Sequence, residues 1–150
     1  MEEVLAQVEQ PKEVKTIVAE VILAKPTKFM NLSGGCVRAL ASTYNVPFEN
    51  ILVLVDDIAF ELGKSRLRYG GSGGQKGMED IINRLGTEKI ARLRIGVGML
   101  RPGEDKASFV LKRFPMESAQ TISDVTDNAA GIAAMWMECG TMYTMNAANK

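Results

Sequence analysis

The 150-residue sequence contains no histidine. Histidine is the commonest general base and the commonest metal ligand in enzymes. Acid–base chemistry within these residues must therefore use carboxylates, lysine or groups that a partner supplies. Only two cysteines are present, Cys36 and Cys139, both in apolar helical patterns. They match no metal motif, and we expect buried free thiols in a reducing compartment rather than a disulfide.

Long apolar runs, low-complexity stretches and internal repeats are also lacking. No apolar run reaches the roughly 18 residues that a membrane span needs. The first ten residues, MEEVLAQVEQ, are acidic and resemble neither a secretory signal nor a transit peptide. We expect one domain over residues 1–150, in the cytoplasm or an organellar matrix (mitochondrion or plastid), and not a secreted protein.

Charge is unevenly placed along a chain whose formal net charge is zero. Residues 64–106 hold 10 basic and 5 acidic side chains, whereas residues 1–63 hold 5 basic and 9 acidic ones. A basic stretch in a neutral protein indicates a polyanion contact on one face. A solvated charged surface is the alternative explanation.

The hydrophobic pattern alternates between strands and helices. Strands are predicted at residues 4–8, 16–24, 51–55, 64–69 and 91–98, with a short extended piece at 108–112. Helices are predicted at 35–44, with Ser33 as N-cap, at 78–85, ended by Gly86, and at 116–139, ended by Gly140. Residues 51–55, ILVLV, are the most apolar run and predict a central buried strand. Together these elements predict an α/β domain with a mixed sheet flanked by helices.

Two stretches of the sequence are candidate functional sites. Residues 64–77, KSRLRYGGSGGQKG, predict a basic strand that leads through a glycine-rich turn into a helix. Helix starts favour anions, but glycine is equally explained by the geometry of a tight turn, and no Walker A or dinucleotide motif is present. Asp56 and Asp57 follow the predicted central strand, where α/β sheets place their sites. For an isolated pair of aspartates, an Asx turn or a helix cap is the favoured explanation.

Four separated motifs resemble one family. KPTKFMNLSG (25–34), ILVLVDDIAFELGKSRLRYGGSGGQKGMEDIINRLGT (51–87), RLRIGVG (92–98) and FVLKRF (109–114) are similar to bacterial-type peptidyl-tRNA hydrolase, over roughly residues 15–146. The resemblance implies cleavage of the ester between a peptide and the terminal adenosine of tRNA. It also implies no cofactor and no metal, and a histidine, held by an aspartate, that activates water.

The resemblance also implies roles for single residues. Asn31 would position the substrate and the water, Phe29 would line the same pocket, and Asp56 would orient the histidine. Gln75 and Lys76 stand where the family has a histidine and a substrate-contacting asparagine. The basic side chains expected to face tRNA phosphates are Arg66, Arg68, Arg92 and Arg94.

The departures lead to three hypotheses. The family's first strand and the helix with the catalytic histidine have no counterpart in this sequence, so we expect binding of tRNA or ribosomal RNA without hydrolysis. Loss of a general base typically costs about 10²–10⁴ in rate. The first alternative is an authentic hydrolase represented by a truncated chain. The second is a structural subunit of a ribosome-like particle, with a protein partner covering the sheet edge left by the missing strand.

Overall fold

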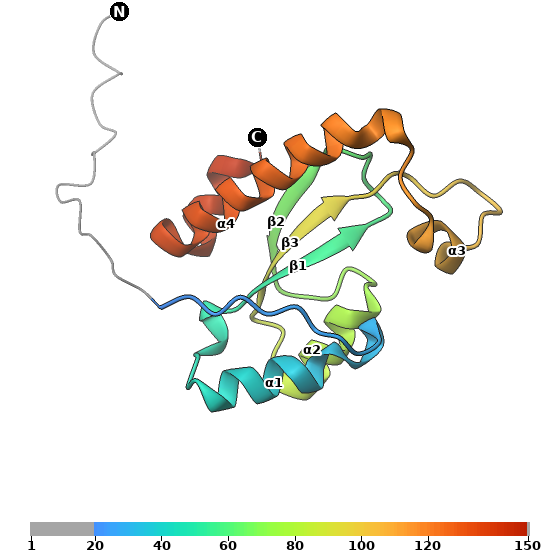
Figure 1. Ribbon diagram of the computed structural model, residues 1–150. Coiled ribbons are helices and arrows are strands. Elements are labelled where there is room, and N and C mark those ends of the chain that lie inside the picture. The colour runs from blue at the N-terminus through green and yellow to red at the C-terminus, as the bar shows by residue number, and fades with distance from the viewer. Residues whose placement is uncertain (1–19, 150) are drawn as a thin grey trace, which may run out of the picture.

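The computed structural model describes residues 20–149, and it is a three-layer α/β arrangement (Figure 1). None of the described helices combines the length and hydropathy of a membrane span. The elements are η1 (Met30–Leu32), α1 (Ser33–Thr43), η2 (Phe48–Asn50), β1 (Leu52–Asp57), β2 (Ser65–Tyr69), α2 (Lys76–Leu85), β3 (Ala91–Gly96), α3 (Lys106–Leu111), η3 (Met116–Ser118) and α4 (Ala119–Ala148).

The sheet is mixed, as predicted, and its strand order is β1-β3-β2. β1 runs parallel to β3, and β2 runs antiparallel to it. The prediction that residues 51–55 form the central strand is wrong for the described sheet, because β3 lies between the other two. Leu54 of β1 is accordingly 53% exposed, whereas Leu93 of β3 is fully buried. Strand order depends on pairing between distant segments, which local hydrophobicity does not encode.

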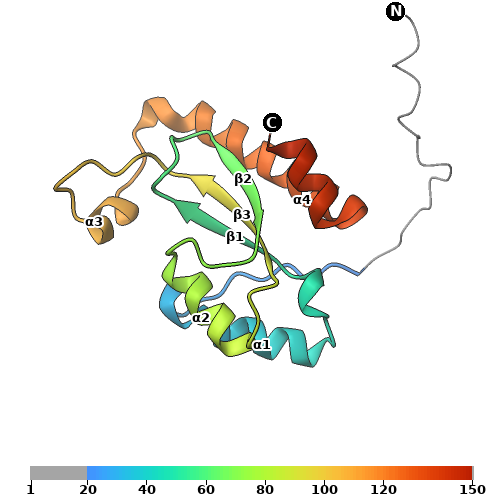
Figure 2. The same cartoon turned by 180° about the vertical axis from the view of Figure 1, so that it is seen from behind.

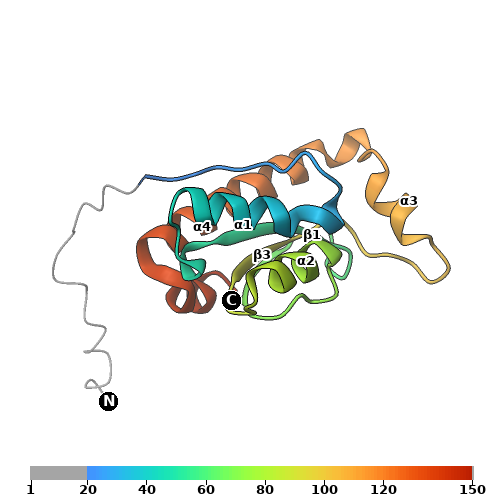
Figure 3. The same cartoon turned by 90° about the horizontal axis from the view of Figure 1, so that it is seen from below.

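Helices cover both faces of the sheet. Helix α4 lies on one face (Figure 2), where Ala129 and Ile132 pack against Leu67 and Leu93. Helices α1 and α2 lie side by side on the other face (Figure 3). Their core is formed by Met78, Ile81 and Ile90, with partly buried side chains from β1 packed against it. The core beneath α4 thus uses the alternating apolar residues of β2 and β3. The core beneath α1 and α2 uses the apolar side chains that recur with helical periodicity in α2.

Several local predictions need correction. Ser33 is the first residue of α1 rather than its N-cap, and its hydroxyl donates to the Met30 carbonyl at 2.7 Å. Residues 108–112 are not extended, because they belong largely to α3. The Asp105 side chain caps that helix by accepting from the Ser108 amide at 2.8 Å, and these hydrogen bonds lower the pKa of Asp105. A local cap has therefore outweighed the β-propensity of this segment.

Other predictions are confirmed or fall outside the described residues. Gly86 ends α2 in a left-handed conformation, and Gly140, with φ of 76°, interrupts the helical geometry of α4 as expected of a cap. The strand predicted at 4–8 lies outside the described residues, and so does part of the one at 16–24. The described part, residues 20–24, forms neither strand nor helix. Both cysteines are free thiols, as expected, but neither is buried: Cys36 is half-buried and Cys139 is exposed.

Asn149 closes the outer edge of β2 as a neighbouring strand would. Its side-chain amide donates to the Leu67 carbonyl at 2.8 Å, and its side-chain oxygen accepts from the Leu67 amide at 2.9 Å. Its backbone carbonyl also accepts from Arg66 at 3.2 Å. One side chain thereby satisfies both ladder groups of Leu67 and anchors the end of α4 to the sheet.

We predict that Asn149→Ala lowers the free energy of unfolding by about 1–3 kcal/mol, because both partly buried backbone groups of Leu67 lose their partner. Urea denaturation measures this loss. Asn146→Ala is the matched control, since Asn146 is exposed on the same helix. Equal losses in the two variants would show that the edge contact contributes nothing.

Candidate active site

Close packing of η1 and α1 on α2 brings Met30 and Asn31 to the start of α2. Gly34 makes this approach feasible: its amide donates to the Asp80 carboxylate at 2.7 Å, and a Cβ there would lie 2.3 Å from the Asp80 carbonyl oxygen. Gly77 likewise allows η1 to pack closely on the start of α2, because a Cβ at Gly77 would lie 2.9 Å from Cγ of Met30. Gly34 of NLSG and Gly77 in the first turn of α2 are thus needed for contact between these helices.

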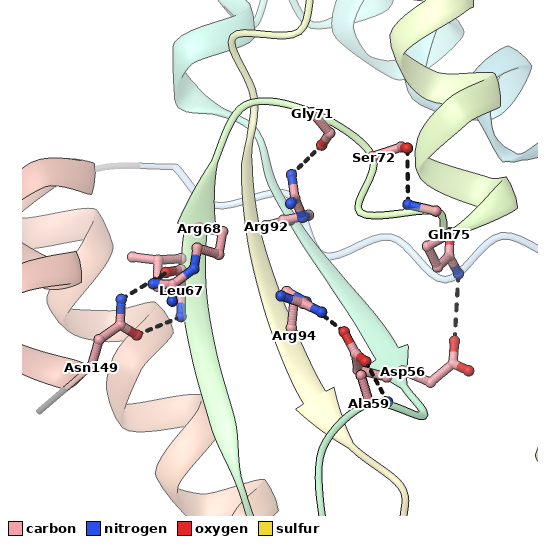
Figure 4. Close-up of polar contacts among 12 residues, drawn as sticks. Asp56, Ala59, Leu67, Arg68, Gly71, Ser72, Gln75, Arg92, Arg94 and Asn149 are labelled. Atoms are coloured by element: carbon pink, nitrogen blue, oxygen red, sulfur yellow. Dashed lines mark hydrogen bonds and ion pairs between the residues drawn. The ribbon is translucent and has the colours of Figure 1, made fainter. Parts of the chain in front are cut away.

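Gln75 joins three segments at this point (Figure 4). As N-cap of α2, its side-chain oxygen accepts from the Met78 amide at 2.8 Å. Its side-chain nitrogen lies 3.4 Å from Oδ1 of Asp56 and 2.7 Å from the sulfur of Met30. A single amide therefore caps a helix and ties it to the end of β1 and to η1.

The remaining predicted site residues lie around this amide. Asn31 follows Met30 in η1, and Phe29 precedes it with its side chain 81% exposed. Lys76 is the exposed first residue of α2. Within residues 20–149, neither Asn31 nor Lys76 makes a side-chain hydrogen bond, so both side chains are available to a ligand. The structure thus brings Asp56, Gln75 and the neighbours Asn31 and Lys76 to one edge of the sheet.

The two aspartates after β1's apolar run have different environments. Asp57 forms an Asx turn, its Oδ1 accepting from the Ala59 amide at 2.8 Å, and its Oδ2 pairs with Nε of Arg94. The Arg94 guanidinium also stacks on Phe60, 4.5 Å from the ring centroid. The structural interpretation of the aspartate pair therefore applies to Asp57, and only Asp56 is directed toward Gln75.

The register of β2 and β3 sorts the four arginines into cross-strand pairs. Arg66 lies opposite Arg94, and Arg68 lies opposite Arg92. Arg66 is exposed, whereas Arg92 is only 7% exposed and donates through Nη1 to the carbonyls of Gly70 and Gly71. Arg92 and Arg94 thus have partners within the fold, a role that the sequence analysis missed. Contact of any of the four with tRNA stays a prediction.

Two open grooves follow β2 at the far edge of the sheet from β1. They measure about 340 and 360 Å³ and share Arg66 and Asn149; Lys64 lines the first and Arg68 the second. Among residues 20–149, no ion pair involves Lys64, Arg66 or Arg68. Glu61 also lines the first groove, whereas the charged side chains that line the second are both arginines. No group of three potential metal-binding side chains occurs in the part of the chain that the structure describes.

Residues 3–150 match the family model for peptidyl-tRNA hydrolase. The chain belongs to the peptidyl-tRNA hydrolase family. It is 42% identical over 131 residues to peptidyl-tRNA hydrolase of Chlorobium phaeobacteroides, covering 87% of this chain and 69% of that protein. It is 41% identical over 132 residues to the Bacteroides fragilis enzyme, covering 87% and 71%.

A solved structure confirms the fold of this peptidyl-tRNA hydrolase family member. Crystalline peptidyl-tRNA hydrolase from Acinetobacter baumannii superposes with a TM-score of 0.73 at 29% identity. The match covers 83% of this chain and 63% of that one, so the chain spans less than two thirds of the solved structure.

The comparisons favour the first alternative hypothesis over the main one. The relatives named above are peptidyl-tRNA hydrolases, whereas the main interpretation was RNA binding with hydrolysis lost. Nothing in these comparisons points to an inactive branch of the family. A ribosomal RNA partner, a protein covering the sheet edge and a role as structural subunit remain predictions without support.

Proposed function

We propose that this chain acts in the hydrolysis of peptidyl-tRNA and that it supplies the edge at which the ester is held. The observation that supports this most is the meeting of Asp56, Gln75 and the Met30–Asn31 segment at one place. These segments are distant in sequence, and each carries a motif that resembles the family. The Gln75 amide lies 3.4 Å from the Asp56 carboxylate, and the exposed residues Asn31 and Lys76 are the chain neighbours of Met30 and Gln75.

In the proposed reaction a water oxygen attacks the carbonyl carbon of the ester. The bond from that carbon to the ribose oxygen breaks, which gives the peptide carboxylate and a free ribose hydroxyl. The water must lose a proton and the ribose oxygen must gain one. Asp56 is the carboxylate placed to accept or direct that proton, Asn31 would hold the carbonyl and the water, and Lys76 at the helix start would favour developing negative charge.

Cleavage of an N-acylated aminoacyl-tRNA by the purified protein tests this proposal. Released tRNA and peptide should accumulate together, at a rate above that of spontaneous ester hydrolysis. Binding of the same tRNA, measured in parallel at stated salt, separates the two leading hypotheses. Binding without turnover would overturn the proposal and restore the RNA-binding interpretation, and neither binding nor turnover would point to the structural subunit.

The exposed arginine of β2 and its neighbour are predicted to contact the phosphate backbone. Arg66→Gln and Arg68→Gln should each weaken tRNA affinity by about threefold to tenfold and reduce the slope of log K against log salt by about one. Arg113→Gln is the matched control, because Arg113 is exposed and lies outside the grooves. Equal effects of all three substitutions would indicate a diffuse charge effect rather than a binding strand.

A further inference from the structure

We propose that Arg92 is a positioning residue that holds the glycine-rich turn, residues 70–75, so that Gln75 and Lys76 face Asp56. The family resemblance implied that Arg92 is one of the cations that contact tRNA. The structure instead buries it beneath that turn, between the arginine strand and the candidate active site (Figure 4).

Arg92 fixes the start of the turn from inside. Its Nη1 donates to the carbonyls of Gly70 and Gly71, while the Gly70 amide donates to the Ile90 carbonyl at 3.2 Å. The turn also packs against the guanidinium plane: a Cβ on Gly73 would lie 3.3 Å from Nη2 of Arg92. Gly73 has φ of +63°, a conformation that glycine adopts without strain. The turn therefore contacts the Arg92 guanidinium through two backbone carbonyls and through Gly73, where a side chain would leave little space.

Short local bonds connect that anchor to the site. The Gly74 amide donates to the Ser72 hydroxyl at 3.1 Å, and the Gln75 amide donates to the Ser72 carbonyl at 3.3 Å. Two side chains then bond out of the turn: the Ser72 hydroxyl donates to the Glu79 carboxylate at 3.5 Å, and the Gln75 amide bonds to Asp56. Only residues 72–74 separate Gly71, whose carbonyl Arg92 binds, from Gln75, so we expect movement at the anchor to reach Gln75.

Stability alone does not explain an arginine here. Its Nε is buried without a hydrogen-bond partner in the described structure. Burial, and then repulsion from Arg94 and Arg68, lowers the pKa of Arg92. A buried cation with a missing partner and two cationic neighbours is costly, and apolar side chains often replace buried charges without loss of stability. The gain is a rigid, planar guanidinium that bonds two consecutive carbonyls through Nη1 and packs against Gly73 through Nη2. The flexible ammonium of lysine does not fix that plane, and an apolar residue donates no hydrogen bond.

The consequence for binding rests on the proposed function. If the turn carries Gln75 and Lys76 to the ester, loosening it should impair recognition of the acylated 3′ end. Recognition of the tRNA body should persist, because Arg66 lies in β2 and Lys64 directly before it, both outside the turn. This distinguishes a positioning role from a phosphate contact, which would weaken binding of both ligands.

The experiment compares wild type, Arg92→Lys and Arg92→Met using two ligands and one spectroscopic signal. The ligands are a nonhydrolysable N-acylaminoacyl adenosine amide and a tRNA without its 3′-terminal adenosine. The signal is the ¹⁵N–¹H resonance pair of the Gln75 side-chain amide. We expect a shift or broadening of that pair, about tenfold weaker binding of the adenosine ligand, and less than twofold change for the tRNA.

The matched control is Arg38→Lys. Arg38 also donates to a backbone carbonyl, that of Arg84 at 3.2 Å, but on the exposed side of α1. It should leave all three readouts unchanged. Unaltered Gln75 resonances in both folded Arg92 variants would overturn the inference, and so would equal weakening of the two ligands. Failure of wild type to bind the adenosine ligand would overturn the proposed function, while the Gln75 signal would still test Arg92.

Discussion

Replacing Asp56 by asparagine is expected to lower kcat for peptidyl-tRNA hydrolysis by about 10²- to 10⁴-fold. Asparagine has the same shape and keeps an oxygen within reach of the Gln75 side-chain nitrogen, which lies 3.4 Å away in the wild-type protein. It carries no charge and accepts no proton, so the local fold persists while acid–base chemistry is lost. Single-turnover measurements with saturating protein give the rate of the chemical step without interference from binding.

Asp57→Asn is the matched comparison for this prediction. Asp57 is the next residue of β1, but its oxygens are engaged with the Ala59 amide and with Arg94. We expect Asp57→Asn to lower stability and to change kcat by less than about tenfold. If Asp56→Asn retains turnover within threefold of wild type, the carboxylate takes no part in the reaction. A larger kcat loss in Asp57→Asn than in Asp56→Asn would contradict this prediction, because it would indicate that Asp57 is the carboxylate that takes part in the reaction.

Gly34→Ala is expected to lower the free energy of unfolding by about 3–5 kcal/mol, the largest stability effect predicted for this chain. The added Cβ would lie 2.3 Å from the Asp80 carbonyl oxygen, 2.6 Å from its carbonyl carbon and 2.7 Å from Cγ of Arg84. Two of these atoms belong to the backbone of α2, so a side-chain rotation cannot relieve the contact. The helices must separate, which also breaks the bond from the Gly34 amide to the Asp80 carboxylate.

The neighbouring glycine provides the control. Gly35 lies in the same helix, and a Cβ there would meet nothing within 4 Å. Gly35→Ala should therefore stabilise the protein by about 0.5–1 kcal/mol, since alanine is the better helix former. Urea denaturation of both variants measures the difference. If Gly34→Ala destabilises the protein and Gly35→Ala stabilises it, the close approach of α1 to α2 decides the effect. If both substitutions stabilise it, helix propensity dominates.

The site could be predicted in part from the sequence because its residues belong to short motifs. Asp56 ends an apolar strand, Asn31 lies in FMNLSG, and Gln75 precedes a helical pattern. What the motifs did not reveal is how they meet. The contact of Gln75 with both Asp56 and Met30 joins residues that are 19 and 45 positions apart, and no local pattern encodes such a distance.

The arginines show the same division. Alternation along β2 and β3 determined that Arg66 and Arg68 share a face, as do Arg92 and Arg94, because side chains on a strand alternate with period two. Only the tertiary structure decided that Arg66 is exposed and that Arg92 is buried. β3 lies at the centre of the sheet and the turn after β2 folds over Arg92, so a cation that resembles an RNA contact in sequence becomes an internal anchor.

The sequence by itself determined the family, the α/β class and the end of α2 at Gly86, since these depend on neighbouring residues. Strand order, the closing of β2 by Asn149 and the separate roles of Asp56 and Asp57 were decided by the tertiary structure. Those features depend on hydrogen bonds and packing between segments far apart in the chain. These interactions contribute free energy only after the segments have come together in the fold, so no local sequence pattern encodes them.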